Sequence, residues 1–317
     1  MLLKGGDIML SSPMEVLSRF PVRKSNRQKQ LFRDSVQTYA QDLGYTVAVE
    51  NAAWGGRNLI IGDPESARYL VTAHYDTPAR LPFPNAINPC NFFVFILRQA
   101  AQWLGIMLIA VVLSVAAGLT LGEEWTSITA VIGVYGCLLL MLIGPANPSN
   151  ANDNTSGVVT LLEIARTLPQ NRRDKVCFVL FDLEEAGLLG SGSYRRKHKK
   201  VTQNQLVLNL DCVGDGDHIR MFPTKKLRKD RKKCTALYQA CGYFGKKDIL
   251  VHEKGFYTYP SDQKRFPYGV GICALHKGKA GLYLSRIHTS KDTCLDINNI
   301  NILRAALTSF ICCDEVY

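Results

Sequence analysis

The hydrophobic pattern divides the chain into an apolar middle and two flanks in which amphipathic stretches alternate with short apolar runs. Residues 25–43 carry apolar side chains at helical spacing and end before Gly44, so they predict an amphipathic helix. Residues 156–168 predict another. Apolar runs that stop at polar clusters predict buried strands, which cover residues 69–73, 176–181, 206–210 and 270–275. Strands that alternate with helices predict an α/β fold with a largely parallel sheet.

The apolar middle predicts a transmembrane hairpin. Between Arg98 and Asp153 the only charged residues are Glu123 and Glu124. As a helix, residues 99–122 would extend ~36 Å, which exceeds the ~30 Å hydrocarbon core of a bilayer. A second apolar run covers residues 125–144 and ends at two prolines. The alternative is a pair of helices buried in a large soluble core, but such helices usually carry one polar stripe, and neither run has one.

Charge and cysteine usage place the flanks in the cytoplasm. The chain has 38 Lys and Arg against 27 Asp and Glu, a net charge of +11, while the turn of the hairpin is acidic. The positive-inside rule therefore puts the bulk of the chain on the cytoplasmic side. Residues 1–20 contain no sustained apolar stretch, so we expect no cleaved secretory signal. Ten cysteines without a C-x-x-C pair are typical of a reducing compartment.

Polar side chains follow the predicted strands at their carboxyl ends. His74 and Asp76 come after the first strand, Glu184 and Glu185 after the second, and Asp211 after the third. In open α/β sheets ligands bind at this edge, so these side chains can converge although they lie far apart in the sequence. Two further residues fit the same edge, one before a predicted helix and one after the last strand: Asp153 and His288.

Together these side chains suit a zinc centre. Two imidazoles and three carboxylates are ligands that zinc accepts, and two ions ~3.5–4 Å apart need about this many, with one carboxylate bridging. The set comprises His74, Asp153, Glu185, Asp211 and His288. Simpler explanations exist for single residues: an Asp beside a His is often a hydrogen-bonded pair, and adjacent glutamates can begin a helix. Neither explains the whole set.

Six motifs along the chain read TAHYDTP, NANDNTSG, FDLEEAGLLGSGSY, LNLDCVG, YPSDQKRFPYGVG and IHTSKDT. In this order they resemble the family of di-zinc aminopeptidases, metallopeptidase family 28, which also holds glutaminyl cyclases and glutamate carboxypeptidases. The resemblance implies a three-layer α/β sandwich with a mostly parallel, mixed central sheet. It implies that His74 and Asp211 bind one zinc, that Glu185 and His288 bind the other, and that Asp153 bridges both.

The resemblance also assigns supporting roles. Glu184 would be the general base toward a metal-activated water, Asp76 would orient His74, and Asn154 would hold the bridging loop. The family commonly reads Ser-Asp-His where this chain has Gln263 in third place, so we expect consequences for the substrate pocket rather than loss of metal. The donor that stabilises the oxyanion stays open, with two candidates near that motif, Tyr257 and Tyr259.

The hairpin interrupts the peptidase domain. The expected division is residues 1–90, the insertion 91–147, and residues 148–317. Because His74 and Asp153 must meet at one metal, the chain between them has to cross a membrane an even number of times, and two spans satisfy this. The sequence thus predicts an integral membrane protein with its catalytic domain at the cytoplasmic face.

The favoured function is a zinc aminopeptidase that removes N-terminal residues from peptides. Two alternatives stay open: a glutaminyl cyclase, for which one tightly bound zinc would be diagnostic, and a non-catalytic receptor or scaffold on the same fold. Two basic runs are either solvated surface or contacts to anionic lipid head groups, namely Arg195–Lys200 and Lys225–Lys233. We expect no nucleic acid partner, because neither a recognition helix nor an aromatic stacking platform accompanies these runs.

Overall fold

The computed structural model describes residues 10–81 and 85–313. The expectation of a missing signal rests partly on residues 1–9, which lie outside this range. The predicted helices are present as α2 (Asn26–Asp42) and α5 (Gly157–Thr167). A capping box at Ser25 and Gln28 begins α2, and Gly44 follows its end with a φ of 87°, a left-handed conformation that glycine adopts without strain. The other helices of the body are α1 (Glu15–Arg19), α6 (Leu189–Lys197), α7 (Lys199–Thr202), α8 (Lys225–Lys229), α9 (Arg231–Ala236) and α10 (Ile297–Cys312).

One mixed sheet forms the centre of the body. Its four middle strands run parallel in the order β5-β3-β6-β10 and correspond to the four predicted strands. Antiparallel pairs flank them, which confirms a mostly parallel, mixed sheet. The strands are β1 (Val47–Asn51), β2 (Arg57–Ile61), β3 (Tyr69–His74), β4 (Ala86–Ile87), β5 (Val176–Phe181), β6 (Leu206–Leu210), β7 (His218–Pro223), β8 (Gly242–Phe244), β9 (Lys247–Val251), β10 (Gly269–Gly278) and β11 (Gly281–Ser285).

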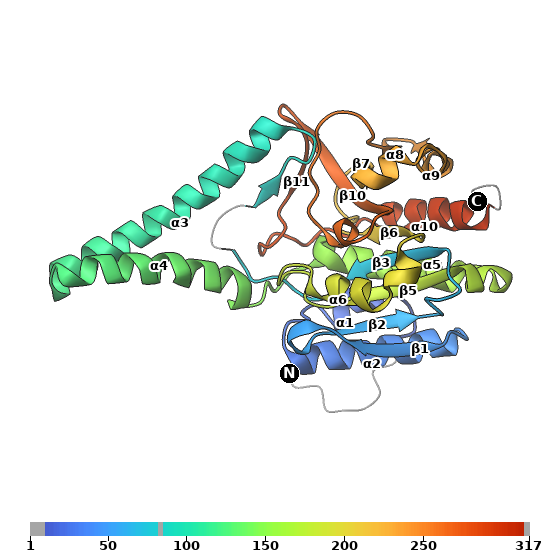
Figure 1. Cartoon of the computed structure of the whole chain (residues 1–317), viewed down its shortest axis with the longest axis horizontal. Coiled ribbons are helices and arrows are strands. Elements are labelled where there is room, and N and C mark those ends of the chain that lie inside the picture. The colour runs from blue at the N-terminus through green and yellow to red at the C-terminus, as the bar shows by residue number, and fades with distance from the viewer. Residues whose placement is uncertain (1–9, 82–84, 314–317) are drawn as a thin grey trace.

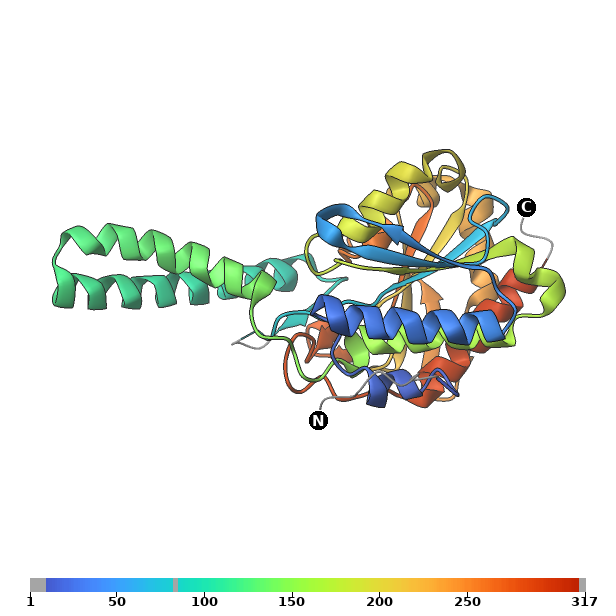
Figure 2. The same ribbon diagram turned by 90° about the horizontal axis from the view of Figure 1, so that it is seen from below.

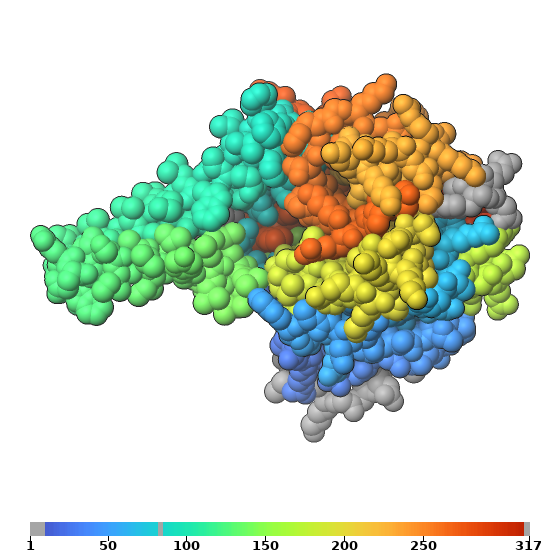
Figure 3. All heavy atoms as spheres, viewed as in Figure 1, coloured from blue at the N-terminus to red at the C-terminus, as the bar shows by residue number. Residues whose placement is uncertain are grey.

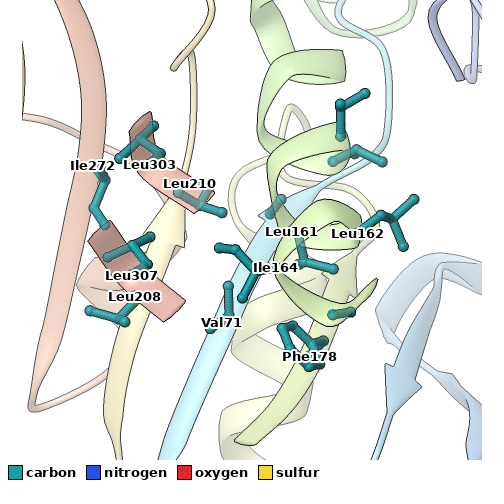
Figure 4. Packing of buried hydrophobic residues seen from close by; sticks show 14 of the residues in the cluster. Val71, Leu161, Leu162, Ile164, Phe178, Leu208, Leu210, Ile272, Leu303 and Leu307 are labelled. Atoms are coloured by element: carbon teal, nitrogen blue, oxygen red, sulfur yellow. The ribbon is translucent and has the colours of Figure 1, made fainter. Parts of the chain in front are cut away.

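Helices cover both faces of this sheet, so the fold has three layers. Alternate residues of β5 belong to different core clusters: Phe178 packs with α2, α5 and α10, whereas Phe181 packs with Tyr194 of α6. Figure 2 shows α2, α5 and α10 on one side of the strands. Figure 4 shows how the leucines of α5 and α10 meet β3, β6 and β10. This two-sided burial is why the middle strands read as continuous apolar runs.

The apolar middle of the chain folds as two helices that project from the body (Figure 1). They are α3 (Phe92–Leu121) and α4 (Glu124–Ile143), and both are long and apolar enough to cross a membrane by length and composition. The first begins seven residues earlier than predicted, because the Asn91 side chain caps its N-terminus, and it therefore includes Arg98. Leu119 is 84% exposed and Ile132 62%. The alternative of helices buried in a soluble core is therefore wrong.

The two helices of the hairpin pack through small residues. A Cβ on Gly133 would lie 3.1 Å from the Cα of Ala110, and the Ser114 hydroxyl donates to the Thr126 carbonyl at 2.6 Å. Small residues at a helix–helix contact are typical of apolar helices that associate in lipid.

The four parallel strands of the sheet run toward the hairpin. β2 runs away from the hairpin in Figure 1, and β5 is antiparallel to β2, so β5 and the strands parallel to it run the opposite way. The carboxyl edge of the parallel strands therefore faces the hairpin.

Candidate metal centre

The structure brings the five predicted ligands together at this carboxyl edge. His74 is the last residue of β3, and Asp211 directly follows β6. Asp153 lies in the turn that precedes α5, and its peptide bond to Asn154 is cis. The His74 Nε2 atom lies 3.3 Å from Asp153 Oδ1 and 3.6 Å from Asp211 Oδ1. These three residues thus offer one group of ligand atoms within 4.8 Å of one another.

A second group shares the same aspartate. The His288 Nε2 atom lies 3.0 Å from Asp153 Oδ2 and 3.5 Å from Glu185 Oε2. One oxygen of Asp153 therefore faces His74, and the other faces His288. A carboxylate with one oxygen in each group has the geometry of a bridging ligand.

The electrostatics of the cluster fit a divalent cation. Burial would lower the pKa of His288, but the carboxylates of Glu185 and Asp153 outweigh it and raise this pKa to about 9. Burial, with Asp153 nearby, raises the pKa of Glu185 to about 8. Packed acids and imidazoles in a dry site share protons, and a bound cation removes that conflict. Oxygen and nitrogen donors of this kind fit zinc.

The backbone that holds these ligands is strained. Leu183 precedes the two glutamates with a φ of 56°, Cys212 follows Asp211 with a φ of 56°, and His288 has a φ of 57°. Side chains other than glycine rarely adopt this left-handed conformation, and where they do, they often lie at functional sites. His288 is itself a predicted ligand, and the other two residues lie within two positions of one.

Asn154 connects the loops that carry the ligands. Its amide nitrogen donates to the carbonyl of Leu210 at 2.9 Å and of His74 at 3.4 Å. Its oxygen accepts the N–H groups of Gly157 and Cys212 at 3.0 and 3.2 Å. A single buried amide thus joins β3, β6 and the start of α5, as expected from the sequence.

Asp76 has a larger role than the expected contact with His74. Its Oδ1 lies 3.5 Å from His74 Nδ1, which is long for a hydrogen bond. The same atom accepts the N–H of Glu184 at 3.1 Å, and Oδ2 accepts the N–H of Glu185 at 3.2 Å. Asp76 therefore fixes the backbone of the glutamate pair while it faces the histidine.

Glu184 lies beside the predicted ligands. It forms a group with His74 and Glu185 whose ligand atoms lie within 4.8 Å. Burial raises its pKa well above the ordinary value, and the charges of Glu185 and Asp262 add to this. Burial likewise raises the pKa of Asp262 to about 7. Asp262 lies in the YPSDQKRFPYGVG motif, but its sequence position alone did not predict a place beside the ligands.

Three other supporting residues were also missed. Asp292 accepts the N–H groups of Asn152 and Asp153 at 2.8 and 2.9 Å. Arg23 is fully buried and donates to the Tyr75 carbonyl at 2.5 Å. Lys29 pairs with Asp182 at 2.5 Å in a buried contact. Only Asp292 carried a signal in the sequence, because it lies in the IHTSKDT motif.

The motif around Gln263 is structural in this chain. The Gln263 amide donates to the Tyr259 carbonyl at 2.8 Å and accepts from Asn209 at 3.2 Å, within the core. Tyr259 donates its hydroxyl to the Asp211 carbonyl at 2.9 Å, and Tyr257 donates to the Pro223 carbonyl. Both hydroxyls thus donate to backbone carbonyls, and a role of either tyrosine toward an oxyanion stays a prediction.

Comparison with known proteins finds similar sequences and folds. Aminopeptidase YwaD of Bacillus subtilis (strain 168) is 42% identical over 73 residues, which is 22% of this chain and only 16% of that protein. Among solved structures, a Zn-dependent exopeptidase from Parabacteroides distasonis has a TM-score of 0.57 at 19% identity, covering 96% of this chain and 98% of its own. A glutaminyl cyclase from Porphyromonas gingivalis has a TM-score of 0.55 at 17% identity, with the same coverage.

At 19% and 17% identity, the likeness to these two structures shows that the fold is shared and nothing further. The sequence profile that describes Peptidase family M28 matches residues 139–310, which is more than half of the chain. That range contains four of the five predicted ligands, and the fifth, His74, lies within 3.3 Å of one of them. The chain therefore belongs to peptidase family M28.

Proposed function

We propose that the protein is a membrane-anchored, zinc-dependent aminopeptidase. The observation that carries the proposal is the position of Asp153, whose two oxygens face His74 at 3.3 Å and His288 at 3.0 Å. His74 and Asp211 would hold one zinc, Glu185 and His288 the other, and Asp153 would bridge them. The family and the aminopeptidase relative support peptides as substrates.

Bound zinc would lower the pKa of a coordinated water and polarise the carbonyl of the scissile peptide bond. The residues of the chain supply the rest of the reaction. Glu184, held by the hydrogen bond from its N–H to Asp76, takes a proton from the attacking water and returns it to the leaving amine.

A substitution at Glu184 tests this assignment. We expect Glu184→Gln to retain zinc and to lose aminopeptidase turnover by a factor of ~10²–10⁴, the usual contribution of a positioned acid–base group. The matched control is Glu65→Gln, because that side chain is 65% exposed. Full activity of Glu184→Gln on an aminoacyl amide would remove the residue from its role.

Metal content separates the aminopeptidase from the cyclase. Five ligand positions in two groups around Asp153 support two zinc ions per chain. Elemental analysis of the purified protein measures this directly. One zinc per chain, together with cyclisation of an N-terminal glutamine and no release of amino acids, would establish the alternative instead. A protein that binds zinc but catalyses neither reaction would fit the receptor or scaffold.

The proposed anchor is the hairpin of α3 and α4, with the body on the cytoplasmic side. The tip carries Glu123 and Glu124, whereas Lys24 and Arg98 lie near the base, and this asymmetry follows the positive-inside rule. In this scheme residues 1–90 and 148–317 form the peptidase domain, and residues 91–147 are an insertion. β3 of the first part lies between β5 and β6 of the second.

Anionic lipid contacts through the basic runs Arg195–Lys200 and Lys225–Lys233 stay a prediction. In Figure 1, α8 and α9 lie on the side of the body away from the hairpin. Lys233 lies 3.7 Å from the ring centroid of Tyr268, and Arg228 lies 4.9 Å from that of Tyr257. These local contacts favour a solvated surface for the second run.

A further inference from the structure

A cleft of about 310 Å³ joins the metal centre to the end of the hairpin. Asp76 and Glu185 line one part of it together with Lys24 and Lys29, and the last residues of α4, Leu142 and Ile143, line another. Figure 3 shows the base of α4, in green, lying against the body. The hairpin is therefore part of the wall of the site and not only an attachment.

Several contacts hold this wall in place. The Lys24 ammonium donates to the Leu142 carbonyl at 3.2 Å, which satisfies one of the free carbonyls at the C-terminus of α4. The next residues of the chain form an isolated bridge, Ala79 with Ala146, and the Arg80 N–H donates to the Pro145 carbonyl at 2.8 Å. The end of α4 is thus bound to the segment that follows Asp76, so the hairpin and the metal centre keep a fixed relation.

The length of α4 indicates where the cleft lies relative to the bilayer. Its 20 residues extend ~30 Å, which equals the hydrocarbon thickness of a typical bilayer. If α4 crosses the bilayer, it uses its whole length to do so. Its last residues, Leu142 and Ile143, then lie at the boundary between hydrocarbon and head groups, and they are the residues that line the cleft.

Trp54 of the body lines the same cleft as the end of α4, and its properties fit the same boundary between hydrocarbon and head groups. It lines the cleft, is 81% exposed, and has a left-handed backbone with a φ of 53° in the turn between β1 and β2. A large indole in water gains no burial energy to offset this strain. Tryptophan prefers the membrane–water interface, where the ring is half-buried and its N–H stays hydrated.

We propose that the cleft opens at the membrane–water interface and takes the N-terminal segment of peptides whose following residues are bound to the bilayer. This rests on the proposed aminopeptidase function and names its substrate class. The N-terminus of the peptide would enter the part that Glu185 and Asp76 line, next to the metal centre. The chain behind it would pass Trp54, Leu142 and Ile143, whose apolar surfaces match a segment that lies in the interface.

The first experiment measures the position of the cleft without any turnover. The chain has three tryptophans, so replacing Trp103 and Trp125 by Phe leaves Trp54 as the sole indole. The full-length variant is reconstituted in phosphatidylglycerol vesicles with brominated acyl chains. We expect loss of Trp54 emission when the bromine lies near the head groups, and less loss when it lies near the bilayer centre. Unquenched emission from the inserted protein would overturn the proposal.

The second experiment measures substrate choice. Two peptides share the same N-terminal residues, and one carries a C-terminal palmitoyl chain. In vesicles we expect kcat/KM for the anchored peptide to exceed that of the soluble one by at least about tenfold, since both partners share one surface. Ile143→Asn should reduce this ratio. Leu119→Ala, 84% exposed near the tip of the hairpin, should leave it unchanged.

The outcomes separate this proposal from the proposed function. Equal kcat/KM values for the two peptides would overturn the substrate class while leaving the aminopeptidase intact. Quenched Trp54 emission with no hydrolysis of either peptide would place the cleft at the bilayer and remove the aminopeptidase, and with it the substrate class.

Discussion

Asp76→Asn tests whether one buried carboxylate aligns both the histidine and the glutamate pair. Asp76 is 4% exposed, and its two oxygens accept the N–H groups of Glu184 and Glu185. An asparagine has nearly the same shape but offers one oxygen and one NH₂ group. Whichever way the amide turns, the NH₂ group faces one backbone N–H, so one donor loses its acceptor.

The size of the effect follows from the two losses. Removing the partner of a metal-binding histidine typically lowers metal affinity by a factor of ~10–100, which is ~1.4–2.7 kcal/mol. Leaving one buried N–H without an acceptor costs ~1–3 kcal/mol of folding free energy. We therefore expect Asp76→Asn to weaken zinc binding and to destabilise the metal-free protein by amounts in these ranges.

Two assays separate these effects. Competition with a chromophoric chelator measures zinc affinity, and urea unfolding of the chelated protein measures stability without metal. The control is Asp63→Asn, because Asp63 is exposed and its carboxylate accepts hydrogen bonds only from nearby residues of the same turn, such as the N–H of Glu65 at 2.9 Å. Unchanged zinc affinity in Asp76→Asn would show that the carboxylate does not position the site, and the role given to it here would be wrong.

Three further predictions follow from the packing. A Cβ at Gly190 would lie 2.1 Å from the Asp182 carbonyl, so Gly190→Ala should cost ~1–3 kcal/mol in thermal or urea unfolding, whereas Gly192→Ala in the same helix, with its nearest neighbour at 3.7 Å, should be neutral or gain up to about 1 kcal/mol. Lys29→Met leaves the buried Asp182 carboxylate without its cation and should lower the free energy of unfolding by ~3–5 kcal/mol. Adding Asp182→Asn should recover part of this loss in a double-mutant cycle, and purely additive losses would contradict the pairing. Chelation should lower the unfolding temperature, and zinc should restore it where magnesium does not, because two ligands are imidazoles; recovery with magnesium would point to an oxygen-only site.

The sequence predicted the middle of the fold better than its edges. β3, β5, β6 and β10 are covered on both faces, so their apolar runs are continuous and easy to recognise. β1 and β8 have partly exposed residues and no such run, so their sequences did not predict strands. Edge strands form because a neighbour supplies hydrogen bonds, and a local pattern does not record this.

The site shows the same division. The convergence of His74 and Asp211 was predictable because they lie at the carboxyl ends of buried strands, and these ends must meet at one edge. Arg23 and Lys29 were not, because they lie in a basic stretch that looks like the solvated start of a helix. Their burial depends on the sheet edge against which α2 packs, and that contact is fixed only by the tertiary structure.

Two consecutive residues show how the insertion and the metal centre depend on each other. Arg23 points into the core, where it donates to the carbonyl of Tyr75 and to the hydroxyl of Thr155, next to the loops of His74 and Asp153. Its neighbour Lys24 points the other way and binds the end of α4. Burial lowers the pKa of Arg23 to about 10, but the carboxylates of Asp76 and Asp153 oppose this, so the guanidinium stays charged at neutral pH.

The segment before α2 therefore holds the ligand loops with one side chain and the hairpin with the next. The hairpin is inserted between His74 and Asp153. Without such a link, movements of its two long helices would displace the loops that position both residues. The contacts of Lys24 with Leu142 and of Ala79 with Ala146 oppose that movement at the base of the hairpin. The base of the hairpin and the loops of the predicted ligands are thus parts of one connected unit.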